Sequence, residues 1–354
     1  MIITDYREIF KLDKAILDEI DPEIHKLLLF WKSDEEKITV QTSGSTGNPK
    51  KINISKKQMT ISAEATLKHF NINENSTFLN CLPVKYIGGK MMLVRAILSK
   101  GKIILCKPLS IPMKVLDIEI DFIALTPLQL GNILDNENIF KKIKLAIVGG
   151  GIVSKTLISK INNIPTQCFQ TYGMTETVSH IAVRNLKNCN YKTPYKCLND
   201  ITIETNKNEQ LLINSKKLNI ESLITNDKVK ILSDKEFLFL NRIDNIINSG
   251  GLKINPLEIE NEIFKNFSDD NFFIDKIKND KFGEEIILIA CKDVDIDQLI
   301  ESISLIKEKK IRPKKIFIVD RFIFNDNQKI DKIKSKNLAI KLIKYSFINL
   351  QKIN

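Results

Sequence analysis

One loop combines hydroxyl, glycine and lysine side chains in a pattern that suits an anionic ligand. It consists of Thr42, Ser43, Gly44, Ser45, Thr46, Gly47, Asn48, Pro49 and Lys50. Backbone N–H groups, hydroxyls and one cation can together bind a polyphosphate. The loop is not a P-loop, because only two residues separate its glycines and a proline precedes the lysine. A polar surface linker has the same composition, so this segment alone leaves both interpretations open.

A second candidate is the glycine triplet Gly149, Gly150 and Gly151, which follows the apolar run at residues 144–148. A dinucleotide-binding fingerprint would place its last glycine at position 154, where the chain has Ser154. What remains is a backbone without Cβ atoms at the carboxyl end of a predicted strand. A flat base could lie against it, and a tight turn is the alternative.

The segment Gln170, Thr171, Tyr172, Gly173, Met174, Thr175, Glu176 and Thr177 concentrates chemically useful side chains. Tyr172 offers a stacking face, Thr175 a hydroxyl, and Glu176 a carboxylate able to hold Mg²⁺. A strand end followed by a solvated turn is the structural alternative. The eight residues as a unit are distinctive, whereas the Thr-Glu pair alone is not.

A fourth group lies further along the chain and contains Asp227, Arg242, Asp244 and the segment 249–256, which reads SGGLKINP. Asp227 can bind vicinal ribose hydroxyls, and Arg242 can bind a phosphate or a second hydroxyl. Taken singly, such residues are more often turn residues or members of surface ion pairs.

The elements that must position these residues alternate between strands and helices. Short apolar runs predict strands at 37–42, 77–82, 102–106, 121–125, 144–148 and 166–171. Helical spacing predicts helices at 55–69, with Ser55 as N-cap, and at 89–99, after one or two amphipathic helices within residues 1–35. This order predicts an α/β fold with a largely parallel sheet.

The pattern changes twice after that. From about residue 200, short turn-separated strands predict a small antiparallel β subdomain that closes the first domain. After Asp244, helices at 256–264 and 296–307 alternate with strands at 272–278 and 286–291, which predicts a small α+β domain. We therefore expect an N-terminal domain at residues 1–243 and a mobile C-terminal domain at 244–354.

Composition limits the class of protein. Only 13 Gly and 10 Pro occur among 354 residues, which excludes collagen-like and low-complexity chains. The six cysteines form no CxxC pair, so we expect free thiols. The N-terminus lacks a signal-peptide pattern, so we expect a cytoplasmic protein. We also expect no membrane span. The net charge of +11 comes mainly from lysines without interleaved aromatics, which favours solvated surfaces over a nucleic-acid site. With only six arginines in the chain, an Arg is expected where its planar fork is needed.

The four motifs, in this order and spacing, resemble those of the adenylate-forming superfamily of acyl-CoA synthetases, luciferases and peptide-synthetase adenylation domains. The resemblance covers roughly residues 38–335. It implies that residues 43–50 form a mobile pyrophosphate-binding loop and that Gly149–Gly151 and residues 170–173 cradle adenine. It further implies that Thr175 touches the phosphate, that Glu176 holds Mg²⁺, and that Asp227 and Arg242 grip the ribose.

By the same resemblance, Asp244 is the hinge between the domains, and Ser249, Gly250, Gly251 and Lys253 line a tunnel for coenzyme A. The catalytic lysine of the family corresponds to Lys329. Two positions depart from the family pattern, because Asn241 and Gln328 replace glycines; neither change removes a functional side chain. The chain is also short for the superfamily, so that much of the usual N-terminal subdomain is absent or rebuilt.

This compactness, together with residues 172–184, is most similar to the o-succinylbenzoate–CoA ligases of menaquinone synthesis. Such ligases carry an arginine in the helix after a glycine-bearing turn, matched here by Arg95. The acid pocket is then expected to include Tyr86, Gly89, Lys90 and Arg95, although Lys90 and Arg95 lie five residues apart and do not share a helix face.

The resemblance implies a two-step reaction. ATP and Mg²⁺ convert the succinyl carboxylate into an acyl-adenylate, and coenzyme A then takes the acyl group. Two alternatives stay open: a ligase for another aryl or fatty acid, and a non-catalytic member that holds a nucleotide or acyl ligand. Nothing in the sequence indicates the oligomeric state.

Overall fold

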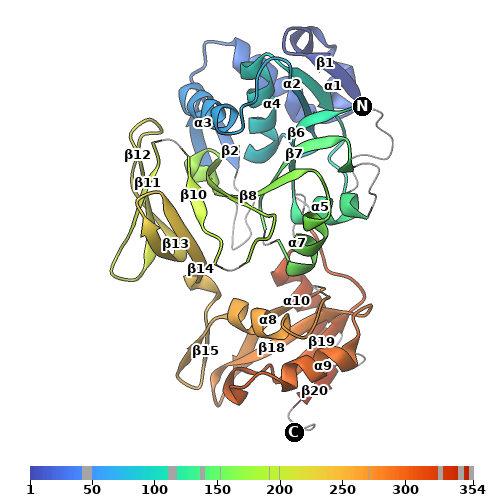
Figure 1. The fold of residues 1–354 in the computed structure, drawn as a ribbon, viewed down its shortest axis with the longest axis vertical. Coiled ribbons are helices and arrows are strands. Elements are labelled where there is room, and N and C mark those ends of the chain that lie inside the picture. Colours follow the sequence, from blue (N-terminus) through green and yellow to red (C-terminus); the bar gives the residue numbers. More distant parts are fainter. Residues whose placement is uncertain are drawn as a thin grey trace.

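The structure is a computed structural model. It describes residues 1–41, 50–110, 118–135, 140–151, 153–190, 192–198, 200–269, 271–325, 330–341 and 347–350. Within these residues the strands form a twelve-stranded sheet, a six-stranded sheet and a two-stranded sheet. Figure 1 shows the large sheet above the six-stranded one.

One half of the large sheet is parallel apart from its first strand. Its order is β1 (Ile2–Asp5), β5 (Lys102–Leu105), β4 (Thr77–Asn80), β6 (Ile120–Leu125), β7 (Ile143–Val148) and β8 (Gln167–Gly173). Strands β5, β4, β6, β7 and β8 run parallel, while β1 is antiparallel to β5. The parallel sheet predicted from the alternation of strands and helices is therefore present. The N-terminal segment was predicted to be purely helical, which is wrong at β1, because residues 2–5 pair with the edge strand β5.

Helices cover both faces of this parallel part, as its apolar strands require. In β7, Leu145 and Ile147 face one hydrophobic core while Ala146 and Val148 face the other. The first core also receives α2 (Pro22–Lys32), α3 (Lys56–His69) and α4 (Ile87–Ser99), and the second receives α5 (Pro127–Leu134) and α7 (Lys155–Asn162). A shorter helix, α1 (Lys14–Asp18), precedes α2.

Local capping signals define where two of these helices begin. Ser55 accepts a hydrogen bond from Gln58 N at 3.1 Å, and the Gln58 side chain returns to Ser55 N at 3.0 Å. Thr126 and Gln129 form the same capping box at α5. The predicted N-cap at Ser55 is therefore confirmed.

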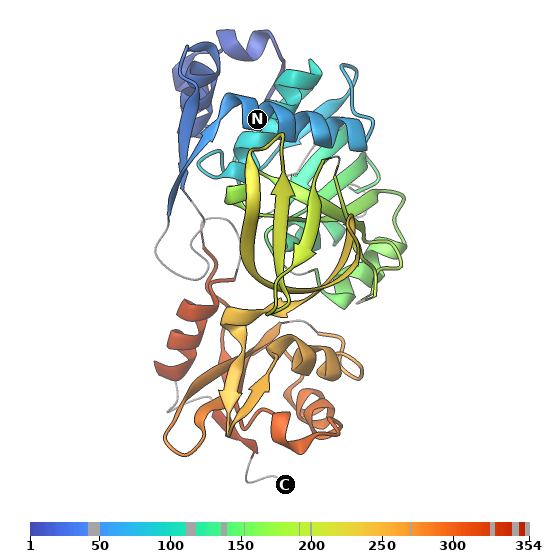
Figure 2. The ribbon, with the colours of Figure 1, turned by 90° about the vertical axis from the view of Figure 1, so that its left-hand side faces the viewer.

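The other half of the large sheet is antiparallel (Figure 2). Its order is β9 (His180–Asn185), β10 (Tyr195–Cys197), β14 (Glu236–Arg242), β13 (Ile220–Ser233), β12 (Gln210–Ser215) and β11 (Thr202–Thr205). The strands from about residue 200 were predicted to form a small antiparallel β subdomain. They are antiparallel but belong to the same sheet as the parallel strands, because β9 pairs antiparallel with β8. Strand β13 is longer than the short turn-separated strands predicted for this region, because it runs without a break through Thr225 and Asp227.

A hairpin of β2 (Lys37–Gln41) and β3 (Lys51–Ser55) brackets the hydroxyl-rich loop. The register pairs Gln41 with Lys51, so the two ends of the loop lie close together. Of the loop itself, only Lys50 falls within the described residues.

A separate hydrophobic core begins at Ile247, just after the predicted domain boundary at Asp244. Its sheet consists of β15 (Ile247–Ser249), β16 (Leu252–Ile254), β17 (Phe272–Asn279), β18 (Gly283–Cys291), β19 (Lys315–Val319) and β20 (Phe347–Asn349). The helices of this region are α8 (Pro256–Ile263), α9 (Ile296–Ser304) and α10 (Lys332–Lys341). Among the helices that the structure describes, none is long and apolar enough to cross a membrane.

Candidate active site

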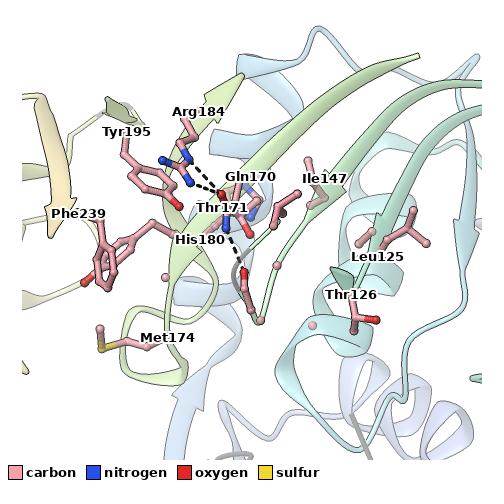
Figure 3. A pocket seen from close by; sticks show the side chains of 18 of the residues that line it. Leu125, Thr126, Ile147, Gln170, Thr171, Met174, His180, Arg184, Tyr195 and Phe239 are labelled. Carbon is pink, nitrogen blue, oxygen red and sulfur yellow. Dashed lines mark hydrogen bonds between the residues drawn. The ribbon is translucent and has the colours of Figure 1, made fainter. Parts of the chain in front are cut away.

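A cleft of about 1520 Å³ opens at the carboxyl ends of β6, β7 and β8. Ligands bind at this edge in open α/β sheets, because loops that follow neighbouring parallel strands meet there. Of the predicted site residues, the cleft is lined by Lys50, Tyr86, Gly89, Arg95, Gly149, Gly150, Gly151, Gln170, Thr171, Tyr172, Gly173, Thr175, Glu176 and Arg242. Five separate segments of the chain therefore share one cavity. Figure 3 shows part of its lining, including Gln170, Thr171 and Arg184.

The glycine triplet forms one wall of the cleft, and its first and last members have little room for a side chain. A Cβ atom on Gly149 would lie 2.7 Å from Thr171 Oγ1, and one on Gly151 would lie 3.2 Å from the Pro127 ring. Gly150 has a φ of 83°, which L side chains rarely adopt. Glycine therefore lets the backbone lie close to Thr171 and Pro127 at positions 149 and 151, and it allows the turn at position 150.

Gln170 ties this wall to the antiparallel strands. Its Nε2 donates to the carbonyl of Gly151 at 3.0 Å, and its Oε1 accepts from Arg184 Nε and Nη2 at 3.0 and 2.6 Å (Figure 3). The Arg184 guanidinium also lies 4.7 Å from the ring centroid of Tyr195. The hydrogen bonds account for the orientation of Gln170 and join β8 and β9 to the glycine wall.

The turn that carries Thr175 and Glu176 is held in an unusual conformation. Residues Thr175–Thr177 form a 3₁₀ turn, and Val178 follows with φ 68° and ψ −52°. This is a γ-turn of the strained kind, closed by Ser179 N donating to Thr177 O at 2.8 Å. Thr177 Oγ1 also accepts from Met174 N at 3.0 Å. Strain of this kind is found where surrounding contacts over-determine a functional site.

Asp227 and Arg242 meet across neighbouring strands, where the register of β13 and β14 places them opposite each other. Tyr172 Oη donates to Asp227 Oδ2 at 2.6 Å, and Arg242 Nη1 donates to Asp227 Oδ1 at 3.1 Å. The same guanidinium holds Asp244 through Nε at 3.0 Å and Nη2 at 2.8 Å. Arg242 thus joins Asp227, which is predicted to bind the ribose, to Asp244, which is predicted to be the hinge.

The electrostatics of this network follow from its burial. Burial raises the pKa of Asp227, although Tyr172 and Arg242 both oppose the rise. Burial also raises the pKa of Tyr172, and the adjacent Asp227 charge adds to that effect. At Asp244, burial alone would raise the pKa, but the hydrogen bonds and charge of Arg242 leave it lowered.

Arg95 is a buried cation in the wall of the cleft. It is 2% exposed, and burial lowers its pKa to about 9. Its Nη2 donates to Ser179 Oγ at 2.6 Å, whereas its buried Nε has no hydrogen-bond partner. Among the ion pairs of the described residues, none involves Arg95. The surroundings therefore orient this charge without neutralising it.

Lys90, the other candidate for the acid pocket, lies outside the cleft lining. Its Nζ donates to the carbonyl of Val84 at 2.7 Å and lies 3.9 Å from Glu23 Oε2. Burial lowers the pKa of Lys90, while the charge of Glu23 opposes that effect. The separation of Lys90 and Arg95 on α4 agrees with the prediction that they do not share a helix face.

Several other predicted residues also lie away from the cleft lining. Asp227 reaches it through its hydrogen bonds with Tyr172 and Arg242, and Asp244 through those with Arg242. Ser249, Gly250, Gly251 and Lys253 belong to the β15–β16 hairpin, in which the two glycines have φ values of 56° and 83°. Thr42, Ser43, Gly44, Ser45, Thr46, Gly47 and Lys329 fall outside the described residues.

The lower wall of the cleft comes from helix α8, beyond the predicted hinge. Leu257, Glu260, Asn261 and Phe264 line it. Across the cleft, the ammonium of Lys155 lies 6.0 Å from the ring centroid of Phe264. The two parts of the chain are further joined by a hydrogen bond from Thr156 Oγ1 to the carbonyl of Ser268. Residues on both sides of Asp244 thus enclose the same space.

Four residues that line the cleft were not predicted from the sequence, namely Ser179, His180, Arg184 and Tyr195. A signal for Arg184 was available in the composition. Of the six arginines in this lysine-rich chain, Arg95, Arg184 and Arg242 line the cleft. In a chain with so few arginines, each arginine is a candidate for a position that uses the planar guanidinium group. No comparable signal distinguishes Ser179 or Tyr195.

The residues present fit a magnesium ion that is shared with a substrate. Among the described residues, no group of three His, Cys, Asp or Glu side chains could enclose a metal. Mg²⁺ does not require such a group, because it usually binds one or two carboxylates together with substrate phosphates and water. Glu176, which lines the cleft, supplies one such carboxylate.

Comparisons with known proteins agree with this geometry. Residues 34–205 match the family model described as AMP-binding enzyme. The 2-succinylbenzoate–CoA ligase of Bacillus subtilis is 24% identical to the chain, over 91% of this chain and 72% of that protein. A Listeria monocytogenes protein of the same name is also 24% identical, over 91% of this chain and 74% of its own length.

Solved structures extend the likeness to the whole fold. The acyl-CoA synthetase (AMP-forming)/AMP-acid ligase II-like protein of Dyadobacter fermentans is 28% identical, with a TM-score of 0.62 over 96% of this chain and 99% of that one. The o-succinylbenzoate coenzyme A synthetase of Bacillus subtilis, solved with ATP and magnesium, is 18% identical. Its TM-score is 0.69 over 94% of this chain and 82% of that chain. The resemblance to the adenylate-forming superfamily inferred from the sequence is therefore confirmed, and residues 34–205 carry the match to the AMP-binding enzymes.

Proposed function

We propose that this protein is an ATP-dependent acid–CoA ligase whose acid is o-succinylbenzoate. The observation that carries the proposal is Arg95, a buried guanidinium in the cleft wall without a carboxylate partner among the described residues. Burying an unpaired charge is costly, so an anionic group of the substrate is its expected partner. An acid with a second carboxylate supplies that group, and the curated 2-succinylbenzoate ligases similar to this chain act on such an acid.

In the first half-reaction, the succinyl carboxylate attacks the α-phosphorus of ATP and pyrophosphate leaves. Adenine lies against the wall formed by Gly149–Gly151, and Asp227 together with Arg242 holds the ribose. Lys50 and Thr175 line the part of the cleft that receives the phosphates. Catalysis of phosphoryl and nucleotidyl transfer consists mostly of positioning and charge stabilisation, which these rigid elements provide.

Glu176 would hold the Mg²⁺ that accompanies ATP, and this ion supplies charge neutralisation at the phosphates. The strained turn at Val178 determines where the Glu176 carboxylate can lie. Lys329, by family resemblance, adds a cation beside the attacking carboxylate.

In the second half-reaction, the C-terminal domain rotates about Asp244 and the hairpin with Ser249, Gly250, Gly251 and Lys253 lines the route of coenzyme A. The hydrogen bonds of Asp244 to Arg242 would break when the hinge dihedrals change. The glycines at positive φ leave the hairpin without Cβ atoms at its tip.

Acid-dependent exchange of radioactive pyrophosphate into ATP tests the proposal directly. We expect exchange with o-succinylbenzoate, and none with benzoate or with fatty acids, which lack the second carboxylate. Exchange only with another acid would reassign the substrate within acid–CoA ligases. If no acid supports exchange in a folded protein that binds ATP, the non-catalytic alternative is correct.

A further inference from the structure

A buried histidine lies directly behind Arg95. His180 begins strand β9, lines the cleft while being only 8% exposed, and contacts Thr66 on α3 and Arg95 on α4. Its Nε2 lies 3.1 Å from Thr66 Oγ1, and its Nδ1 lies 3.5 Å from Arg95 Nη2 and 3.4 Å from Ser179 Oγ. Both ring nitrogens therefore face polar partners inside the protein.

The partners determine which nitrogen carries the proton. Thr66 Oγ1 donates its single hydrogen to the carbonyl of Ser62 at 3.1 Å, one turn earlier in α3. The short contact with His180 is then a hydrogen bond only if His180 Nε2 donates. In a neutral imidazole with a proton on Nε2, the other nitrogen has a lone pair. That lone pair faces Ser179 Oγ and Arg95 Nη2, and the Arg95 guanidinium can only donate.

The charged groups around the ring keep it neutral. Burial, then the positive charge of Arg95 on α4 and that of His69 on α3, lowers the pKa of His180 well below its usual range. Asp200 shares a second, small cavity with the ring, and its Oδ2 accepts from Ser215 Oγ at 2.7 Å. A second proton on the ring would also place an N–H against the guanidinium.

We propose that His180 is a positioning residue that fixes the Arg95 guanidinium in the cleft wall through its Nδ1 lone pair and leaves the positive charge of Arg95 uncompensated. A carboxylate at position 180 would orient Arg95 equally well but would neutralise it. A neutral acceptor instead preserves the charge for an anionic group of the acid substrate. That this anionic group belongs to o-succinylbenzoate rests on the proposed function.

Two variants separate this role from simple packing. His180→Gln keeps a side-chain N–H for Thr66 and an oxygen acceptor for Arg95, whereas His180→Phe fills similar space without either. We expect His180→Phe to raise the KM for o-succinylbenzoate by about tenfold or more and to leave the KM for ATP nearly unchanged. His180→Gln should restore most of the loss, and His25→Gln, away from the cleft lining, is the matched control. Equal acid KM values for His180→Phe and the wild type would overturn the proposal.

A spectroscopic measurement tests the geometry without any substrate. In two-bond ¹H–¹⁵N spectra of the histidine-labelled free protein, the signal lost in His180→Gln belongs to His180. We expect it to show a proton on Nε2 only, and to stay neutral from about pH 8 to about pH 5.5. A proton on Nδ1, or titration near the usual histidine pKa, would overturn the proposal. Because this readout needs no acid, it stands even if the exchange assay refutes the proposed function.

Discussion

Replacing Arg95 by methionine is expected to stabilise the fold and at the same time to weaken binding of the acid. Burial lowers the pKa of Arg95 to about 9, against about 12.5 for an exposed arginine. At about 1.36 kcal/mol for each pKa unit, burial of this charge opposes folding by roughly 4–5 kcal/mol near neutral pH. Methionine removes that cost but also loses the hydrogen bond to Ser179 and some packing volume.

The net gain in the free energy of unfolding should be about 1–3 kcal/mol, within the range seen when buried charges are replaced by apolar side chains. The sign of the pH dependence follows from the lowered pKa. The cost of burying the cation is fully present below about pH 9 and declines above it, because the folded protein then loses the proton before the unfolded chain does. The advantage of Arg95→Met should therefore shrink by about 1 kcal/mol between roughly pH 8 and pH 10.

Urea unfolding can be followed by the fluorescence of the only tryptophan, Trp31, which packs against the same hydrophobic core as α4. Arg321→Met, at an exposed position, controls for the general effect of removing a positive charge. In parallel, the KM for o-succinylbenzoate should rise by roughly 10- to 100-fold in Arg95→Met, while the KM for ATP stays nearly unchanged. A destabilised variant with an unaltered acid KM would refute the reasoning, because Arg95 would then be a structural residue.

Three further predictions concern the nucleotide wall, the hinge and the catalytic lysine. Gly149→Ala places a Cβ atom 2.7 Å from Thr171 Oγ1, so the KM for ATP in pyrophosphate exchange should rise while that for the acid changes little; equal changes in both would contradict a nucleotide wall. Asp244→Pro should leave acyl-adenylate formation measurable in a single turnover and abolish thioester formation, because proline fixes φ at the hinge; equal loss of both steps in a folded variant would remove the hinge role. Lys329→Ala should slow adenylation by about 10²–10³ and barely affect thioester formation from supplied acyl-adenylate, whereas Lys334→Ala, at an exposed ion pair with a neighbouring aspartate, should be nearly silent in both assays. Normal adenylation by Lys329→Ala would show that the catalytic lysine has been assigned to the wrong position.

The elements that were predicted well are those decided by short-range interactions. The strand at 121–125 and the helix after Ser55 follow from apolar spacing and a capping box within a few residues. The strand at Ile2–Asp5 was missed, since its pairing partner β5 lies about a hundred residues later in the chain. Likewise, β13 is one long strand where short turn-separated strands were predicted, because pairing with β12 and β14 keeps the backbone extended there.

The same division applies to the cleft. By itself the sequence determined that residues 149–151 and 174–177 follow the ends of strands, since glycine, hydroxyl and carboxylate residues come after extended runs there. The tertiary structure alone decided that Arg95 rather than Lys90 enters the wall, that Tyr172 bonds to Asp227, and that His180 stands behind Arg95. These partners come from different elements, and strand register and helix packing bring them within hydrogen-bonding distance. The local propensity of a segment does not depend on a partner 50 or more residues away. The burial that shifts the pKa values of these side chains arises only when the helices pack against the sheet.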